Sequence, residues 1–115
     1  MEFVKGFIAM SRHENRSTPK IISSVLYTDD QFTGTCLDSP AWFVWLSQAS
    51  TFYYDSRHGT FTAHCEARHR GGRYWIAYRR QAGILRRVHL GKPELLTSQR
   101  LQQTAVVLQT SPLQP

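Results

Sequence analysis

Three consecutive stretches of alternating side chains, joined by glycine-containing links, constrain the fold of this chain more than any other feature. In residues 61–68 every second side chain is small or apolar, namely Phe61, Ala63, Cys65 and Ala67. A period of two is typical of a strand with one buried face. The runs 73–80 and 84–91 follow after links that contain glycine, which supplies the positive φ of tight turns. The pattern predicts an antiparallel meander of three strands.

Capping signals predict two helices around this meander. Ser39 followed by Pro40 is a typical helix start, and the expected helix near 40–49 has an apolar face formed by Trp42, Trp45, Leu46 and Ala49. Thr97 is expected to cap a second helix near 97–109, which presents Leu101, Ala105 and Leu108 on one side. Further strands are expected near 20–28, with 31–37 as a returning partner, and at 51–55. The predicted class is therefore α+β, with a small antiparallel sheet formed by the C-terminal meander and the N-terminal strands.

The last helix is expected to cover one face of this sheet and to leave the other bare. Alternation assigns to the covered face the side chains of Tyr74, Ile76, Tyr78, Ile84, Val88 and Leu90. It also assigns Arg86 to this face, where a charged side chain is unfavourable. The bare face then receives Trp75, Ala77, Arg79, Leu85, Arg87 and His89, together with His64, Glu66 and Arg68. An open alternative is that the early strands and the first helix cover Trp75. A register error of one residue would exchange the two faces.

The chain of 115 residues is long enough for one domain, expected at 19–110 between a flexible N-terminus (1–18) and a loose tail (111–115). A hydrophobic content of 41% and a charged content of 19% favour folding over disorder. No apolar run approaches the length of a transmembrane span, and the first residues lack the order of a signal peptide, so a cytoplasmic protein is expected. Cys36 and Cys65 are then expected to be reduced and buried.

Positive charge is concentrated between Arg57 and Lys92. This segment holds nine basic residues against a single acid, Glu66, whereas the whole chain has a formal net charge of +6. Eight of the nine are arginines, whose planar guanidinium suits phosphates and guanine edges. Aromatic residues lie among them, a combination that is typical of nucleic-acid-binding surfaces. The alternative is a cationic face that only keeps the protein in solution.

Two resemblances support this interpretation. The chain contains a turn glycine before Phe61, the motif EAR at 66–68, RYWIAYRR at 73–80, Leu90-Gly91 and an LT--RL pattern that opens the last helix. Together these motifs resemble an N-terminal module of bacterial LuxR-type transcription regulators. The resemblance covers about residues 40–108, and because the ATPase and helix-turn-helix parts are lacking it implies a module that acts alone or with a partner. The order of three strands and a helix is also similar to plant ethylene-response-factor domains and to the arm-binding domains of tyrosine recombinases. Those domains imply a sheet placed in the major groove of DNA.

Catalytic and metal chemistry receive weaker support. His64, Cys65, His69 and His89 lack the spacing of a zinc site, and His64 and Cys65 are neighbours on a strand that point to opposite faces. No metal or cofactor is therefore expected. Small basic ribonuclease toxins of the RelE type contain stretches similar to YWIAYRR, and Tyr78, Arg79, Arg87, His64 or His89 are candidates for general acid–base groups. That family places helices before its sheet, whereas this chain ends with one.

The sequence thus predicts a non-enzymatic, nucleic-acid-binding accessory module that favours duplex DNA over RNA and works with a protein partner encoded nearby, with no membrane association. The candidate nucleic-acid-binding residues are Arg68, Arg70, Arg73, Trp75, Arg79, Arg87 and His89. The first alternative is a protein–protein interaction subunit of a larger nucleoprotein or transcription-regulatory complex. The second is a metal-free ribonuclease of the toxin type.

Overall fold

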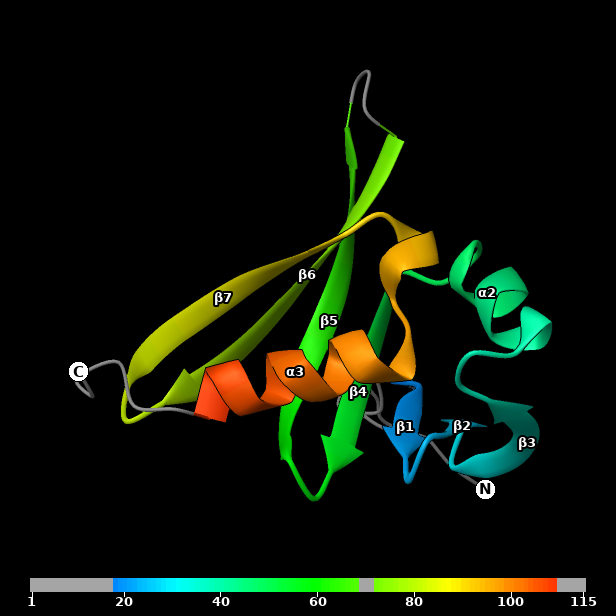
Figure 1. Ribbon diagram of the computed structural model, residues 1–115, viewed down its shortest axis with the longest axis horizontal. Helices are drawn as coiled ribbons and strands as arrows, with labels where there is room; N and C mark the ends of the chain where they lie inside the picture. Colours follow the sequence, from blue (N-terminus) through cyan, green and yellow to red (C-terminus); the bar gives the residue numbers. More distant parts are fainter. Residues whose placement is uncertain (1–17, 69–71, 110–115) are drawn as a thin grey trace, which may run out of the picture.

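The computed structural model of the protein describes residues 18–68 and 72–109 (Figure 1). It has an α+β fold in which seven strands form one sheet, in the order β3-β2-β1-β4-β5-β6-β7. The strands are β1 (Lys20–Ile22), β2 (Val25–Thr28), β3 (Gln31–Cys36), β4 (Thr51–Ser56), β5 (Gly59–Arg68), β6 (Gly72–Gln81) and β7 (Ile84–Gly91). The helices are α2 (Pro40–Leu46), the short 3-10 helix η1 (Pro93–Leu95) and α3 (Ser98–Gln109). The expected flexible segment 1–18, except Thr18, and the expected tail 111–115 lie outside the described residues.

The sheet is larger than predicted, and it is mixed rather than antiparallel. The predicted meander is present as β5, β6 and β7, and β3 returns along β2 as expected. The segment 20–28, however, is two strands joined by a turn at Ser23 and Ser24, whose φ values are 52° and 68°. Two successive residues of positive φ form a type I′ hairpin turn, for which Ser-Ser carries none of the usual Asn-Gly signal. Strand β1 of this hairpin pairs in parallel with β4, and the pairing joins the N-terminal hairpin to the meander.

The predicted caps are confirmed at both helices. The Ser39 hydroxyl accepts a hydrogen bond from the Trp42 backbone N–H at 3.3 Å, and Pro40 is the first residue of α2. The Thr97 hydroxyl accepts from the Arg100 N–H at 3.2 Å. The Asp38 carboxylate accepts at 2.8 Å from the backbone N–H of Ser98, the first residue of α3, where the helix dipole favours negative charge. Asp38 therefore ties the start of α3 to the segment that leads into α2.

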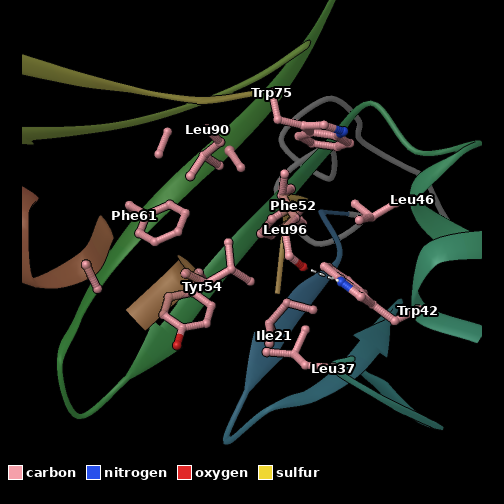
Figure 2. Packing of buried hydrophobic residues seen from close by; sticks show 14 of the residues in the cluster. Ile21, Leu37, Trp42, Leu46, Phe52, Tyr54, Phe61, Trp75, Leu90 and Leu96 are labelled. Carbon is pink, nitrogen blue, oxygen red and sulfur yellow. Dashed lines mark hydrogen bonds between the residues drawn. The ribbon is translucent and has the colours of Figure 1, made fainter. Parts of the chain in front are cut away.

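One apolar core lies between the sheet and the two helices (Figure 2). Helix α3 contributes Leu101, Ala105 and Leu108, as predicted, and α2 contributes Trp42 and Leu46. The Trp42 ring stacks on Trp45 and donates from Nε1 to the Leu96 carbonyl at 2.8 Å, the hydrogen bond drawn in Figure 2. From the sheet, the fully buried side chains include Ile21, Phe52, Tyr54, Phe61, Ala63, Trp75, Ala77 and Leu90. Both helices thus cover the same face of the sheet.

The face predicted for β6 is wrong. Trp75 and Ala77 are each 0% exposed and lie under the helices, whereas Tyr74, Ile76 and Tyr78 point to the opposite, helix-free face. The faces of β5 and β7 are as predicted, because Phe61 and Ala63 are buried while His64, Arg87 and His89 are exposed. Pairing of Ala63 with Ala77 and of Cys65 with Trp75 brings these small and aromatic side chains together in the core. Strand β6 is apolar on both sides, so its alternation could not identify the buried side.

Both thiols are free, as expected, but only Cys65 is half-buried. The prediction that Cys36 is buried is wrong: it ends the edge strand β3 and is exposed. In residues 18–68 and 72–109, no helix is both long enough and apolar enough to cross a membrane.

Candidate nucleic-acid interface

The seven candidate residues do not form one surface. Arg87 and His89 are exposed on the helix-free face, as predicted. The Arg87 guanidinium lies 3.8 Å from the Glu66 carboxylate on the neighbouring part of the face, and the rings of His89 and Tyr74 are in contact at 5.7 Å. The side chain of Arg68 and the whole of Arg70 lie outside the described residues. Arg73, Trp75 and Arg79 are on the side of the helices.

Arg73 holds the end of α2 against the sheet. Its guanidinium donates hydrogen bonds to the backbone carbonyls of Ser47 and Ala49, just after the helix, and its Nε donates to the Cys65 Sγ at 3.2 Å. A cation at the C-terminal end of a helix also complements the negative end of the helix dipole. Arg73 is therefore engaged in the fold rather than presented to a ligand.

Trp75 lies at the centre of the core, where its ring contacts Phe52 at 5.2 Å between centroids. The prediction that Trp75 reaches the bare face is wrong, because its ring is buried in the core on the side of the helices. Its indole Nε1 is buried with no hydrogen-bond partner among the described residues. A fully buried ring cannot stack on a base without unfolding of the protein.

Arg79 pairs across the sheet with Arg86, and both point to the side of α3. Arg86 donates from Nη1 to the Leu108 carbonyl at 2.8 Å, which explains how a cation is accommodated on the covered face. Arg79 is half-buried, and within the described part of the chain its Nη1 has no hydrogen-bond partner. The basic block is thus divided: Arg73, Arg79 and Arg86 face the helices, and Arg80 and Arg87 face away from them.

A continuous row of side chains crosses the helix-free face. The row runs from one edge of the sheet to the other, and each of its residues pairs with the next one across neighbouring strands. Its members are Phe32, Tyr27, Lys20, Tyr53, Thr62, Tyr78 and Arg87. We call this set the aromatic row. Phe32 is 67% exposed and meets Tyr27 edge to face at 5.9 Å between ring centroids, and the three tyrosines are half-buried. No described helix covers it (Figure 1).

The helix-free face is hollowed along this row. A cavity of about 490 Å³ is lined by Thr18, Lys20, Thr51, Tyr53, Thr62 and Tyr78. A smaller one of about 150 Å³ is lined by His64, Glu66, Ile76, Tyr78, Leu85 and Arg87. Tyr78 lines both hollows. In the described ranges, no group of three or more His, Cys, Asp or Glu residues is placed to hold a metal ion.

The sequence-based site missed Tyr27, Phe32, Tyr53 and Lys20. Alternation did contain part of the signal, since Leu26 and Phe52 are apolar neighbours that take Tyr27 and Tyr53 to the other face. What the alternation could not give is the parallel pairing of Lys20 with Tyr53, which joins the two halves of the row.

No protein-family model, curated protein or solved structure was found to match this chain, so the resemblances to LuxR-type regulators and to sheet-based DNA-binding domains stay predictions.

Proposed function

We propose that this protein binds single-stranded nucleic acid along the aromatic row of its helix-free sheet face. The observation that supports this most directly is the register of the row, which places four aromatic rings and two cations in one line across seven strands. Unpaired bases stack on aromatic side chains whatever their sequence, because every base has a π-face, and each such contact is worth about 1–3 kcal/mol. The cavity of about 490 Å³ beside Tyr53 and Tyr78 has room for bases.

The width of the sheet favours a single strand over the duplex DNA expected from the sequence. Seven strands at a spacing of about 4.8 Å span roughly 29 Å, whereas the major groove of B-DNA is about 12 Å wide and admits a helix or a two-stranded ribbon. A flat strand of nucleotides can follow a wide sheet without entering a groove. The rings of the aromatic row would also have no unpaired base to contact on an intact duplex.

The distribution of charge predicts a modest electrostatic contribution. Among the described side chains of the helix-free face, Lys20, Arg80 and Arg87 are cations available to phosphates. Lys20 lies 2.7 Å from Asp30, and Arg87 lies 3.8 Å from Glu66. Phosphates would compete with these exposed carboxylates. With about three phosphates neutralised, the slope of log K against log salt is expected near −2 for a single strand.

Fluorescence anisotropy with labelled single-stranded oligonucleotides of mixed sequence tests the proposal. Tyr53→Ala and Tyr78→Ala are each expected to weaken binding by about 1–3 kcal/mol with the fold intact. Arg87→Ala should also reduce the salt slope by about 0.7. Lys92→Ala, which removes an exposed cation outside the row, is the matched control and should leave both affinity and slope nearly unchanged.

Tighter binding to duplex DNA than to single strands would overturn the preference stated here. The absence of saturable binding to any oligonucleotide would overturn the proposal itself, and would favour a protein–protein interaction subunit.

The smaller hollow supports a second candidate function, the cleavage of RNA without a metal. His64, Glu66, Tyr78 and Arg87 line this cavity of about 150 Å³. Together they offer a general base, a general acid and a cation that would stabilise the charge of the phosphate in the transition state. In such a reaction a base takes the proton of the ribose 2′-hydroxyl, the 2′-oxygen attacks phosphorus, and the 5′-oxygen leaves with a proton. Incubation of labelled RNA with purified protein in EDTA tests this. Intact RNA, or equal cleavage by a His64→Ala preparation, would exclude it.

A further inference from the structure

The single parallel strand pair brings two turns together at one end of the sheet, on the side of the helices. Because Ile22 pairs with Asp55, strands β1 and β4 end at nearly the same level of the sheet. The turn Ser23–Ser24 therefore lies beside the turn Arg57–His58, and both are at the lower edge of the sheet in Figure 1. Gln102 of α3 faces the same space. None of these residues belongs to the aromatic row.

These segments enclose a polar cavity of about 290 Å³. It is lined by four hydroxyl residues, one guanidinium, one imidazole and one carboxamide: Ser23, Ser24, Tyr54, Ser56, Arg57, His58 and Gln102. No carboxylate is among the lining residues, although the sheet has acids elsewhere, such as Asp55 on the other face. The cavity therefore presents hydrogen-bond donors and positive charge without a counter-ion.

The donors are held in place by the fold. The Ser56 hydroxyl accepts from the His58 backbone N–H at 3.1 Å and donates to the Gly59 carbonyl at 3.2 Å, which fixes the turn that carries Arg57. The Tyr54 hydroxyl points away from the apolar cluster in Figure 2, and burial raises the pKa of its phenol, so it keeps its proton. Within the described part of the chain, no hydrogen bond or ion pair engages the Arg57 guanidinium or the Gln102 carboxamide.

We propose that this cavity is a binding site for the dianionic phosphate of a phosphate monoester. A planar guanidinium suits a phosphate better than an ammonium does, because two parallel N–H groups reach two oxygens. The three terminal oxygens of a monoester match a lining that holds many donors, whereas a diester of the nucleic-acid backbone offers only two. The volume is at the lower end of small-molecule sites, which indicates a small ligand. A phosphate here lies apart from the helix-free face and does not depend on nucleic-acid binding.

Calorimetric titration of the full chain with inorganic phosphate and with glycerol 2-phosphate, at pH 8 and constant ionic strength, tests the site. Saturable binding with Kd of about 1 mM or tighter is expected. Arg57→Ala should weaken it at least about tenfold, as loss of a charge-assisted hydrogen bond does. Gln102→Leu, which keeps the size of the side chain on an independent element, should weaken it about fivefold. Lys92→Ala removes an exposed cation that lines neither the cavity nor the aromatic row and should change nothing.

Three results would overturn the assignment. No saturable heat with either ligand would mean that the cavity holds only water. Equal losses from Arg57→Ala and Lys92→Ala would indicate diffuse attraction to a basic protein. Dimethyl phosphate that competes as well as glycerol 2-phosphate would show that the site does not distinguish a monoester from a diester. Oligonucleotide affinity should be unchanged in Arg57→Ala, so that the phosphate site and the aromatic row succeed or fail separately.

Discussion

Two tryptophans of the core differ in one hydrogen bond, and this difference predicts unequal costs for the same substitution. Trp42 and Trp75 are both 0% exposed and both contact Phe52, at 5.5 and 5.2 Å between ring centroids. The indole Nε1 of Trp42 donates to the Leu96 carbonyl at 2.8 Å. The Nε1 of Trp75 has no partner among the described residues. Replacement by phenylalanine removes the indole N–H in both cases and leaves most of the apolar ring in place.

The lost ring volume should cost each variant about 1–2 kcal/mol of unfolding free energy, less than the 3–5 kcal/mol of truncation to alanine. Trp42→Phe additionally loses a buried hydrogen bond and leaves the Leu96 carbonyl without its donor, at about 1–3 kcal/mol. Trp75→Phe removes a buried N–H that has no acceptor, and this offsets part of its cavity cost. We therefore expect Trp42→Phe to be less stable than Trp75→Phe by about 1–3 kcal/mol.

Urea denaturation followed by far-ultraviolet circular dichroism measures both variants without relying on tryptophan fluorescence. The slopes of the unfolding curves should match that of the parent protein, so that the midpoints report stability alone. Equal midpoints, or a lower one for Trp75→Phe, would refute the reasoning, because the Trp75 N–H would then be contributing a hydrogen bond of its own.

Three further perturbations test other parts of the structure. Arg73→Ala should lower the unfolding free energy by about 1–3 kcal/mol, because the Ser47 and Ala49 carbonyls lose their donor, whereas Arg80→Ala should stay within about 0.5 kcal/mol in the same urea titration. Ala82→Asn should raise the melting temperature by about 2–5 °C, since Ala82 has φ 54° in a two-residue turn that favours asparagine; a decrease would argue against that turn. Burial raises the pKa of Tyr54 from its ordinary value of 10.0, so the unfolded chain loses that proton first, and the stability that Tyr54 contributes is complete below pH 10 and lost as pH rises above it. Tyr54→Phe should flatten the decline of stability as the pH rises above about 10, and an unchanged decline would assign it to other groups.

The local structure of this chain could be predicted well because its signals are short-range. The Ser39-Pro40 and Thr97 caps depend on backbone N–H groups within three residues, and both are confirmed. The hairpin link at Ala82-Gly83 and the buried positions Phe61, Ala63 and Leu90 also follow from alternation and turn chemistry. The turn at Ser23-Ser24 was not predicted, and the reason is equally local: serine gives little sign of the positive φ that it adopts there.

The sequence by itself determined the three strands of the meander, the caps of α2 and α3, and the buried side of β5 and β7, where polar and apolar residues alternate clearly. The tertiary structure decided which side of β6 is buried, since Tyr74, Ile76 and Tyr78 are about as apolar as Trp75 and Ala77. In the folded protein Trp75 pairs with Cys65, and Ala77 pairs with Ala63, on the side of the helices. It also decided both candidate sites. The pairing of β1 with β4 places Lys20 beside Tyr53 in the aromatic row, and it brings Ser23 and Arg57 to the same polar cavity. A parallel pairing between segments some thirty residues apart depends on long-range hydrogen bonds and core packing, and these leave no periodic mark in either segment.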